Sequence, residues 1–147
     1  MALRRLNRRA QSRGELAKYL ATKQVPEETI RQVLNRFEEV GLIDDAKFSL
    51  AWVEYRHQTK GLARSAIARE LRAKGVADHI IEDALRTVDD EAEFARAREI
   101  AMRKASRLVE VDRQVAYRRI GSALARKGYS PPVVVRVLGE ILHDWPR

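Results

Sequence analysis

Several residue types that mark large classes of proteins are absent from this chain of 147 residues or scarce in it. It has no cysteine, which excludes disulfides, cysteine-based zinc sites and thiol nucleophiles, and which favours an intracellular protein. It has only seven glycines and four prolines, and so few helix breakers favour α-helix. No apolar run approaches the roughly 20 residues that a membrane span requires, and the basic start lacks the apolar core of a secretory signal. We therefore expect a helical protein of the cytoplasm with no membrane segment.

The residue patterns that support catalysis are missing as well. The glycines are isolated from one another, so no phosphate-binding loop or dinucleotide fingerprint is present. His57, His79 and His143 fall on different segments and lack the spacing of metal ligands. The acidic pairs Asp44–Asp45 and Asp89–Asp90 precede expected helices, where carboxylates cap a helix far more often than they bind a metal. We expect a binding protein that is not an enzyme and has no metal site and no cofactor.

One pattern of residues occurs three times along the chain. In the first copy it consists of Leu16, Leu20, Lys23, Val25, Ile30, Val33 and Leu34. The pattern returns 51 residues later and again 53 residues after that, with apolar residues at the apolar positions and with Lys74 and Lys127 in place of the lysine. Self-similarity of this kind indicates a repeat architecture. The expected repeats are residues 1–43, 44–88 and 89–147.

Each copy of the pattern predicts two helices joined by a tight turn. In the first copy, Ser12 can cap a helix that carries Leu16 and Leu20 on one face. A second helix is expected from about Glu27 to Val40, because its apolar residues are three and four positions apart, and Gly41 ends it. In the third copy the pair Ser130–Pro131 is typical of a helix start.

A further helix is expected before each pair. It begins at Asp44–Asp45 in the second repeat and at Asp90–Glu91 in the third, and only a short version, from about Ala2 to Arg9, precedes the first pair. The prediction is thus an all-α fold of three tandem three-helix repeats. Because each repeat is too small to bury its apolar face alone, we expect the repeats to stack into an elongated, curved helical module. We expect Phe48, Trp52, Tyr55 and Phe94 to lie in the core, and Trp145 to be exposed.

The net charge of +8 is distributed unevenly. Residues 1–24 hold seven Lys or Arg and one acidic residue, whereas residues 25–54 hold three Lys or Arg and seven acidic residues. The acidic third helices would repel phosphate, which argues against the helix-turn-helix mode of reading DNA. A partner or DNA contact is therefore expected on the basic middle helices, through Arg13, Lys18, Lys23, Arg64, Arg69, Arg72, Lys74, Arg118, Arg119, Arg126 and Lys127. The alternative is that these charges form solvated faces and ion pairs between neighbouring helices.

Four segments resemble one known family in the right order. Gly41–Phe48, reading GLIDDAKF, resembles the Gly-Tyr-Leu-Asp-Asp-x-x-Phe segment of the RecX family, with Leu42 in place of the usual aromatic residue. Gly61–Val76 is similar to that family's Gly-x-x-x-Ile-x-x-Glu-Leu-x-x-Lys-Gly segment. Arg126–Ser130 resembles its C-terminal Arg-Gly-Phe-Ser turn, and Ser12–Leu16 its Ser-x-x-Glu-Leu opening.

The resemblance implies a function. RecX proteins bind the RecA recombinase and modulate its filament on single-stranded DNA, mainly by inhibiting strand exchange, ATP hydrolysis and co-protease activity. They do so by lying in the helical groove of the filament, they are not enzymes, and they need no cofactor. The resemblance therefore implies that the partner of this chain is a RecA-type filament with its single-stranded DNA. We expect the protein to act as a monomer.

Two other functions are compatible with the same residues. One is a stand-alone module that binds DNA without sequence specificity, and the other is a helical adaptor for some other acidic protein. Charge reversal at Arg64, Arg69 and Arg72 is predicted to weaken inhibition of the filament and to leave the fold intact.

Overall fold

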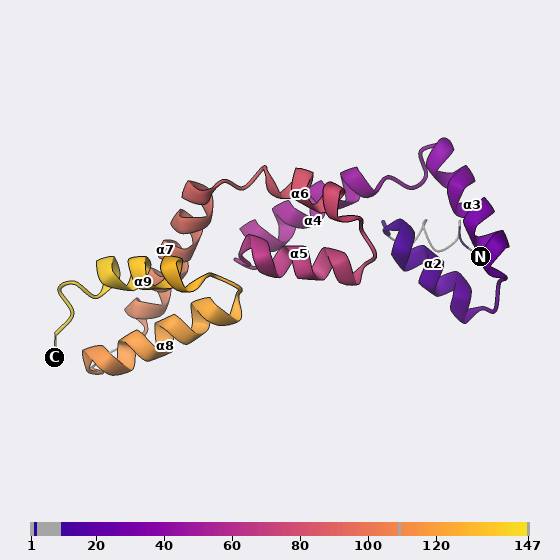
Figure 1. Cartoon of the computed structure of the whole chain (residues 1–147). Helices are drawn as coiled ribbons and strands as arrows, with labels where there is room; N and C mark the ends of the chain where they lie inside the picture. The colour runs from indigo at the N-terminus through magenta and orange to yellow at the C-terminus, as the bar shows by residue number, and fades with distance from the viewer. Residues whose placement is uncertain (1, 3–9, 109, 147) are drawn as a thin grey trace. The chain divides into compact units, whose positions relative to one another are not determined.

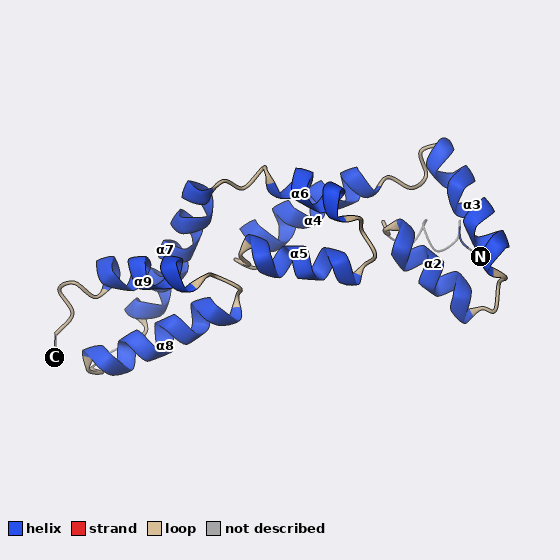
Figure 2. Cartoon of the chain, viewed as in Figure 1, coloured by secondary structure: helices blue, strands red, loops and turns tan. Residues whose placement is uncertain are grey.

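The computed structural model describes Ala2, residues 10–108 and residues 110–146, and α-helices joined by short connections make up this part of the chain, with no strand (Figure 2). This confirms the all-helical prediction. The short helix predicted from Ala2 to Arg9 falls, apart from Ala2, outside the described residues. The described helices are α2 (Arg13–Thr22), α3 (Glu27–Glu39), α4 (Asp45–Gln58), α5 (Arg64–Ala73), α6 (Asp78–Leu85), α7 (Asp90–Ser106), α8 (Arg113–Arg126) and α9 (Pro131–Ile141) (Figure 1).

The chain divides into two compact units. Unit 1 consists of residues 1–53 and 68–85, and unit 2 of residues 54–67 and 86–147. Helices α4 and α5 contribute residues to both units, so the unit boundaries fall inside the second repeat.

Two of the side chains predicted to cap helices do so, whereas Ser130 lies at the N-cap of α9 without a side-chain hydrogen bond to the helix. The Ser12 hydroxyl accepts from the backbone N–H of Glu15 at 3.0 Å, and the Glu15 carboxylate accepts from the backbone N–H of Ser12 at 3.2 Å, which forms a capping box. The Asp89 carboxylate caps α7 by accepting from the backbone N–H of Ala92 at 2.8 Å. Helix α3 ends close to the predicted position, at Glu39.

Each unit has its own apolar core. In unit 1 one cluster of buried residues consists of Ala2, Leu16, Leu20, Ile30, Leu34 and Ile43. In unit 2 a cluster consists of Ala63, Ala97, Ala101, Ala116, Ile120, Leu124, Tyr129, Val137, Leu138 and Leu142. Most of these residues belong to the repeated sequence pattern, so the pattern predicted the buried face of the helices correctly.

Two predictions for aromatic residues are wrong. Tyr55 is 47% exposed and is not a core residue, because the last turns of α4 carry it on their solvent side. Trp145 is not exposed but half-buried against the core of unit 2, and its indole N–H donates to the carbonyl of Val111 at 3.1 Å. A polar local sequence therefore did not reveal that the tail folds back onto the unit.

A contact between the first and second repeats lies inside unit 1. The hydroxyl of Ser12, before α2, donates to the carbonyl of Lys74, after α5, at 2.6 Å. Gly14 and Gly75 meet so closely that a Cβ built on Gly14 would lie 2.6 Å from the Lys74 carbonyl oxygen and 2.7 Å from the Gly75 Cα. We call this contact joint 1.

The equivalent contact between the second and third repeats lies inside unit 2, and we call it joint 2. The backbone N–H of Ala63 donates to the carbonyl of Lys127 at 2.9 Å, and the hydroxyl of Ser65 donates to the carbonyl of Gly128 at 2.6 Å. In both joints the start of the second helix of one repeat meets the Lys-Gly turn of the next. The joints thus link consecutive repeats by the same backbone segments.

The Lys-Gly turn needs glycine for two reasons in joint 2. Gly128 has a φ of +94°, and a Cβ there would lie 2.7 Å from the Cβ of Ala66. Gly41 also has a positive φ, +78°, but a Cβ there would meet nothing within 4 Å. We expect Gly128→Ala to lower the free energy of unfolding by about 1–3 kcal/mol more than Gly41→Ala, because only the first change adds a steric clash to the backbone strain. Urea denaturation of both variants measures the difference, and equal losses would show that the close approach at Gly128 relaxes without cost.

Candidate interaction surface

The structure divides the eleven predicted contact residues into two groups. Arg13, Arg64, Lys74 and Lys127 belong to the joints. The other seven lie at the surface, either on a helix or, for Lys23, at the turn that follows one. These seven are Lys18, Lys23, Arg69, Arg72, Arg118, Arg119 and Arg126.

In joint 1 the two cations bind acidic groups of unit 1. The backbone N–H of Arg13 donates to the Asp45 carboxylate at 2.8 Å, and its guanidinium binds Glu38 at 2.6 Å. Burial raises the pKa of the Asp45 carboxyl, and the hydrogen bond from Arg13 opposes the rise. The ammonium of Lys74 binds the Glu15 carboxylate at 2.9 Å and lies 4.4 Å from the centre of the Trp52 ring. Both cations are therefore held by the fold.

Joint 2 uses Arg64 in the same way. Its backbone N–H donates to the Glu93 carboxylate at 2.8 Å, and its guanidinium binds Glu93 at 3.1 Å and Asp90 at 2.5 Å. Hydrogen bonding to Glu93 raises the pKa of the Arg64 guanidinium above its ordinary value. Charge reversal at Arg64 would bring a third carboxylate to this cluster, so we expect it to destabilise the fold, unlike charge reversal at the exposed Arg69 and Arg72. Arg64 is therefore the wrong choice for a surface variant.

Two further contacts complete joint 2. The ammonium of Lys127 donates to the carbonyl of Lys60 at 2.9 Å. The buried hydroxyl of Tyr129 donates to the carbonyl of Gly61 at 2.8 Å, and burial raises the pKa of this hydroxyl. Neither contact was visible in the sequence, because the partners are 67 and 68 residues apart.

The exposed cations of unit 1 are mixed with acidic groups. Lys18 and Arg72 line a groove of about 860 Å³ between α2 and the end of α5, together with the carboxylates of Glu15 and Glu70. The guanidinium of Arg72 lies 3.2 Å from the carboxylate of Asp78, and both side chains are well exposed. This side of unit 1 therefore presents both signs of charge.

The exposed cations of unit 2 lie on α8. Arg118, Arg119 and Arg126 are exposed, whereas Ala116, Ile120 and Leu124 of the same helix are completely buried. The two sets occupy opposite sides of the helix because of its 3.6-residue period. We call the exposed side, defined by the three arginines, the α8 face.

Sequence reasoning missed further exposed cations near the end of α7. Arg103 and Arg107 are exposed, and Lys104 is half-exposed. The signal was present, since residues 96–127 hold ten Lys or Arg and three acids. Cations at this end also suit the helix dipole, which gives them a structural reason to be there.

Among the residues that the structure describes, no group of three or more His, Asp or Glu side chains could hold a metal ion. None of the described helices is long and apolar enough to cross a membrane.

Comparison with known proteins identifies the repeats. The first, second and third three-helix domains of RecX match residues 1–37, 44–85 and 91–138. The regulatory protein RecX of Streptomyces coelicolor is 44% identical over 144 residues, which cover 98% of this chain and 77% of that protein. The regulatory protein RecX of Amycolatopsis mediterranei is 40% identical over 137 residues, which cover 93% of this chain and 78% of that protein.

Solved structures agree in fold. The crystal structure of RecX from Lactobacillus salivarius gives a TM-score of 0.84 at 24% identity, covering 95% of this chain and 91% of that one. A second crystal structure of a regulatory protein RecX gives a TM-score of 0.76. At this identity the structural likeness is evidence for the fold alone, whereas the sequence matches are evidence for the family. The chain belongs to the RecX family of regulatory proteins.

Proposed function

We propose that this protein binds the filament that a RecA-type recombinase forms on single-stranded DNA and modulates it, mainly by inhibiting strand exchange, ATP hydrolysis and co-protease activity. The observation that carries the proposal is the match of all three repeats to the RecX family. The protein acts by binding and not by catalysis, in the cytoplasm, as a monomer and without a cofactor.

The surface supports this proposal physically. A nucleoprotein filament carries many phosphates, so the seven exposed cations attract it and accelerate association. The filament also repeats along its axis, and several weak contacts from different repeats of one chain add up to a strong one. Regulation of this kind needs no deep ligand pocket.

The direct test is the ATPase rate of a RecA-type recombinase on single-stranded DNA, titrated with this protein. Binding of the protein to the same DNA alone is followed across a salt series. We expect inhibition at less than stoichiometric protein, at salt concentrations where binding to bare DNA has vanished. An unchanged ATPase rate beside strong, salt-dependent DNA binding would support a stand-alone DNA-binding module instead.

A surface variant tests the contribution of unit 1. We expect simultaneous Lys18→Glu, Arg69→Glu and Arg72→Glu to raise the protein concentration for half-inhibition at least about tenfold, because the loss of three contacts worth about 0.5 kcal/mol each sums to about 1.5 kcal/mol. All three side chains are exposed, so circular dichroism should show an unchanged fold.

The control for that variant carries the same change in charge elsewhere. Arg31→Glu, Arg36→Glu and Lys47→Glu alter three exposed cations that lie outside the eleven predicted contact residues. If the control loses as much inhibition as the test variant, net charge is responsible and the assignment of Lys18, Arg69 and Arg72 is wrong. Full inhibition by the folded test variant would contradict it equally.

A further inference from the structure

Helix α8 differs from the other described helices in its charge. Its sequence, RQVAYRRIGSALAR, contains four arginines and no acidic residue. Each of the other described helices, α2 to α7 and α9, contains at least one Asp or Glu. The α8 face is therefore purely cationic, whereas the cations of α2 and α5 share their groove with Glu15 and Glu70.

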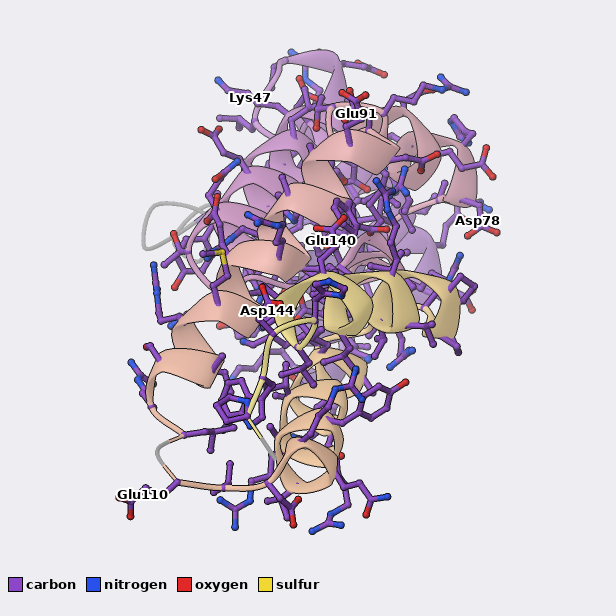
Figure 3. The ribbon with its side chains drawn as sticks, turned by 90° about the vertical axis from the view of Figure 1, so that its left-hand side faces the viewer. Lys47, Asp78, Glu91, Glu110, Glu140 and Asp144 are labelled. Carbon is purple, nitrogen blue, oxygen red and sulfur yellow. The ribbon has the colours of Figure 1, made fainter. Side chains whose placement is uncertain are left out.

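Several acidic groups of unit 2 are paired or placed away from the α8 face. Glu140 binds Arg98 of α7 at 3.1 Å, and Glu93 binds Arg64 in joint 2. Asp112 caps the start of α8 by accepting from a backbone N–H at 2.8 Å. Glu110 lies in the connection between α7 and α8, where it projects away from the helices (Figure 3). No described carboxylate forms an ion pair with Arg118, Arg119 or Arg126.

The spacing of the three arginines suits a chain of phosphates. Arg118 and Arg126 are eight residues apart, which is about 12 Å along a helix axis. A single strand of DNA carries one charged phosphate at every nucleotide, so a face of this length can meet more than one phosphate of the same strand. Between the arginines lie the small exposed residues Ser122 and Ala125, which let a strand approach the helix closely.

A strand of phosphates and a protein surface make different demands. Carboxylates beside the cations repel a continuous row of phosphates, whereas a protein partner offers both signs of charge and pairs with both. Guanidinium groups also bind phosphate oxygens with two parallel hydrogen bonds. The acid-free α8 face therefore suits nucleic acid, and the mixed groove of unit 1 does not.

We infer that the α8 face of the third repeat contacts the sugar-phosphate backbone of single-stranded DNA, without reading its sequence. This inference rests on the proposed function for its biological setting, in which the strand is the one held by the recombinase filament. The contact itself requires no recombinase, so it can be tested separately.

The test is binding of a fluorescein-labelled single-stranded oligonucleotide, followed by anisotropy across a salt series without recombinase. The test variant carries Arg118→Gln, Arg119→Gln and Arg126→Gln, and its matched control carries Arg31→Gln, Arg36→Gln and Lys47→Gln. Each loses three exposed cations, so the net charge changes equally. We expect the slope of log K against log salt to fall by about two in the test variant, at about 0.7 per lost phosphate contact, and to stay unchanged in the control.

A third variant separates the effect of the three positive charges from the effect of the guanidinium groups themselves. Arg118→Lys, Arg119→Lys and Arg126→Lys keeps the three charges, so the salt slope should return to that of the unaltered protein, although affinity is lower without bidentate contacts. Equal slopes in the test variant and its control would overturn the inference. So would a test variant that binds DNA normally but no longer inhibits the recombinase ATPase, because the α8 face would then contact protein. Loss of DNA binding beside full inhibition would support the α8 contact, whereas absence of inhibition by the unaltered protein would refute only the proposed function.

Discussion

Replacing Glu93 with alanine is expected to lower the free energy of unfolding by about 2–4 kcal/mol. The Glu93 carboxylate is 12% exposed and accepts from the Arg64 backbone N–H at 2.8 Å and from the guanidinium Nε and Nη2 at 3.1 Å. Truncation leaves the backbone N–H of Arg64 without its acceptor, and it leaves the Arg64 guanidinium with only the Asp90 carboxylate to balance its charge. The loss stays below that of a fully buried pair, because Arg64 is 31% exposed and still contacts Asp90. Urea denaturation followed by circular dichroism measures it.

Glu91 provides the matched control for this change. It lies in the same first turn of α7 and is exposed (Figure 3). Glu91→Ala removes the same charge from the helix start, so it should cost only about 0.3–1 kcal/mol. If Glu93→Ala costs no more than Glu91→Ala, joint 2 contributes little to stability and the structural role assigned to Arg64 fails.

Leu71→Ala is expected to cost about 2–5 kcal/mol, the usual range for truncating a buried leucine. Leu71 has no exposed surface, and it occupies the repeat position that Leu20 holds in the first repeat and Leu124 in the third. The cost combines lost burial with the cavity that remains, because neighbouring side chains relax only in part.

The control for Leu71 is an exposed leucine in a neighbouring helix. Leu50 of α4 is 46% exposed, and alanine favours helix at least as well as leucine, so Leu50→Ala should change the free energy of unfolding by less than about 0.5 kcal/mol. A loss below about 1 kcal/mol for Leu71→Ala would contradict the burial on which the repeat argument depends.

Much of the fold could be predicted because its causes are local. The spacing of Leu16 and Leu20, or of Ile120 and Leu124, indicates one helix face, and all four are buried. Ser12 and Asp89 reveal helix starts because their side chains bond to backbone within three residues. Tyr55 and Trp145 were predicted wrongly because their burial depends on segments that the local pattern does not include.

The candidate surface was predicted only in part. Arg64 and Arg69 are both basic residues of the same helix, and nothing in the local sequence separates them. The fold brings Arg64 to Glu93, 29 residues away, and leaves Arg69 exposed. Lys74 and Lys127 likewise seemed available until their contacts with Glu15 and with the Lys60 carbonyl were seen.

The sequence by itself determined the helices, the three repeats and the RecX family. The apolar period and the caps act over short stretches of chain, and the repeats and family motifs can be compared directly along the sequence. The tertiary structure decided which charged side chains are paired within the protein and which remain exposed for a partner. It also explains why Gly75 and Gly128 are glycines while Gln24, at the same turn of the first repeat, takes a φ of +63° with a side chain. The second and third turns press against a preceding repeat, and such contacts between residues about 60 apart depend on how the repeats pack, which no local pattern encodes.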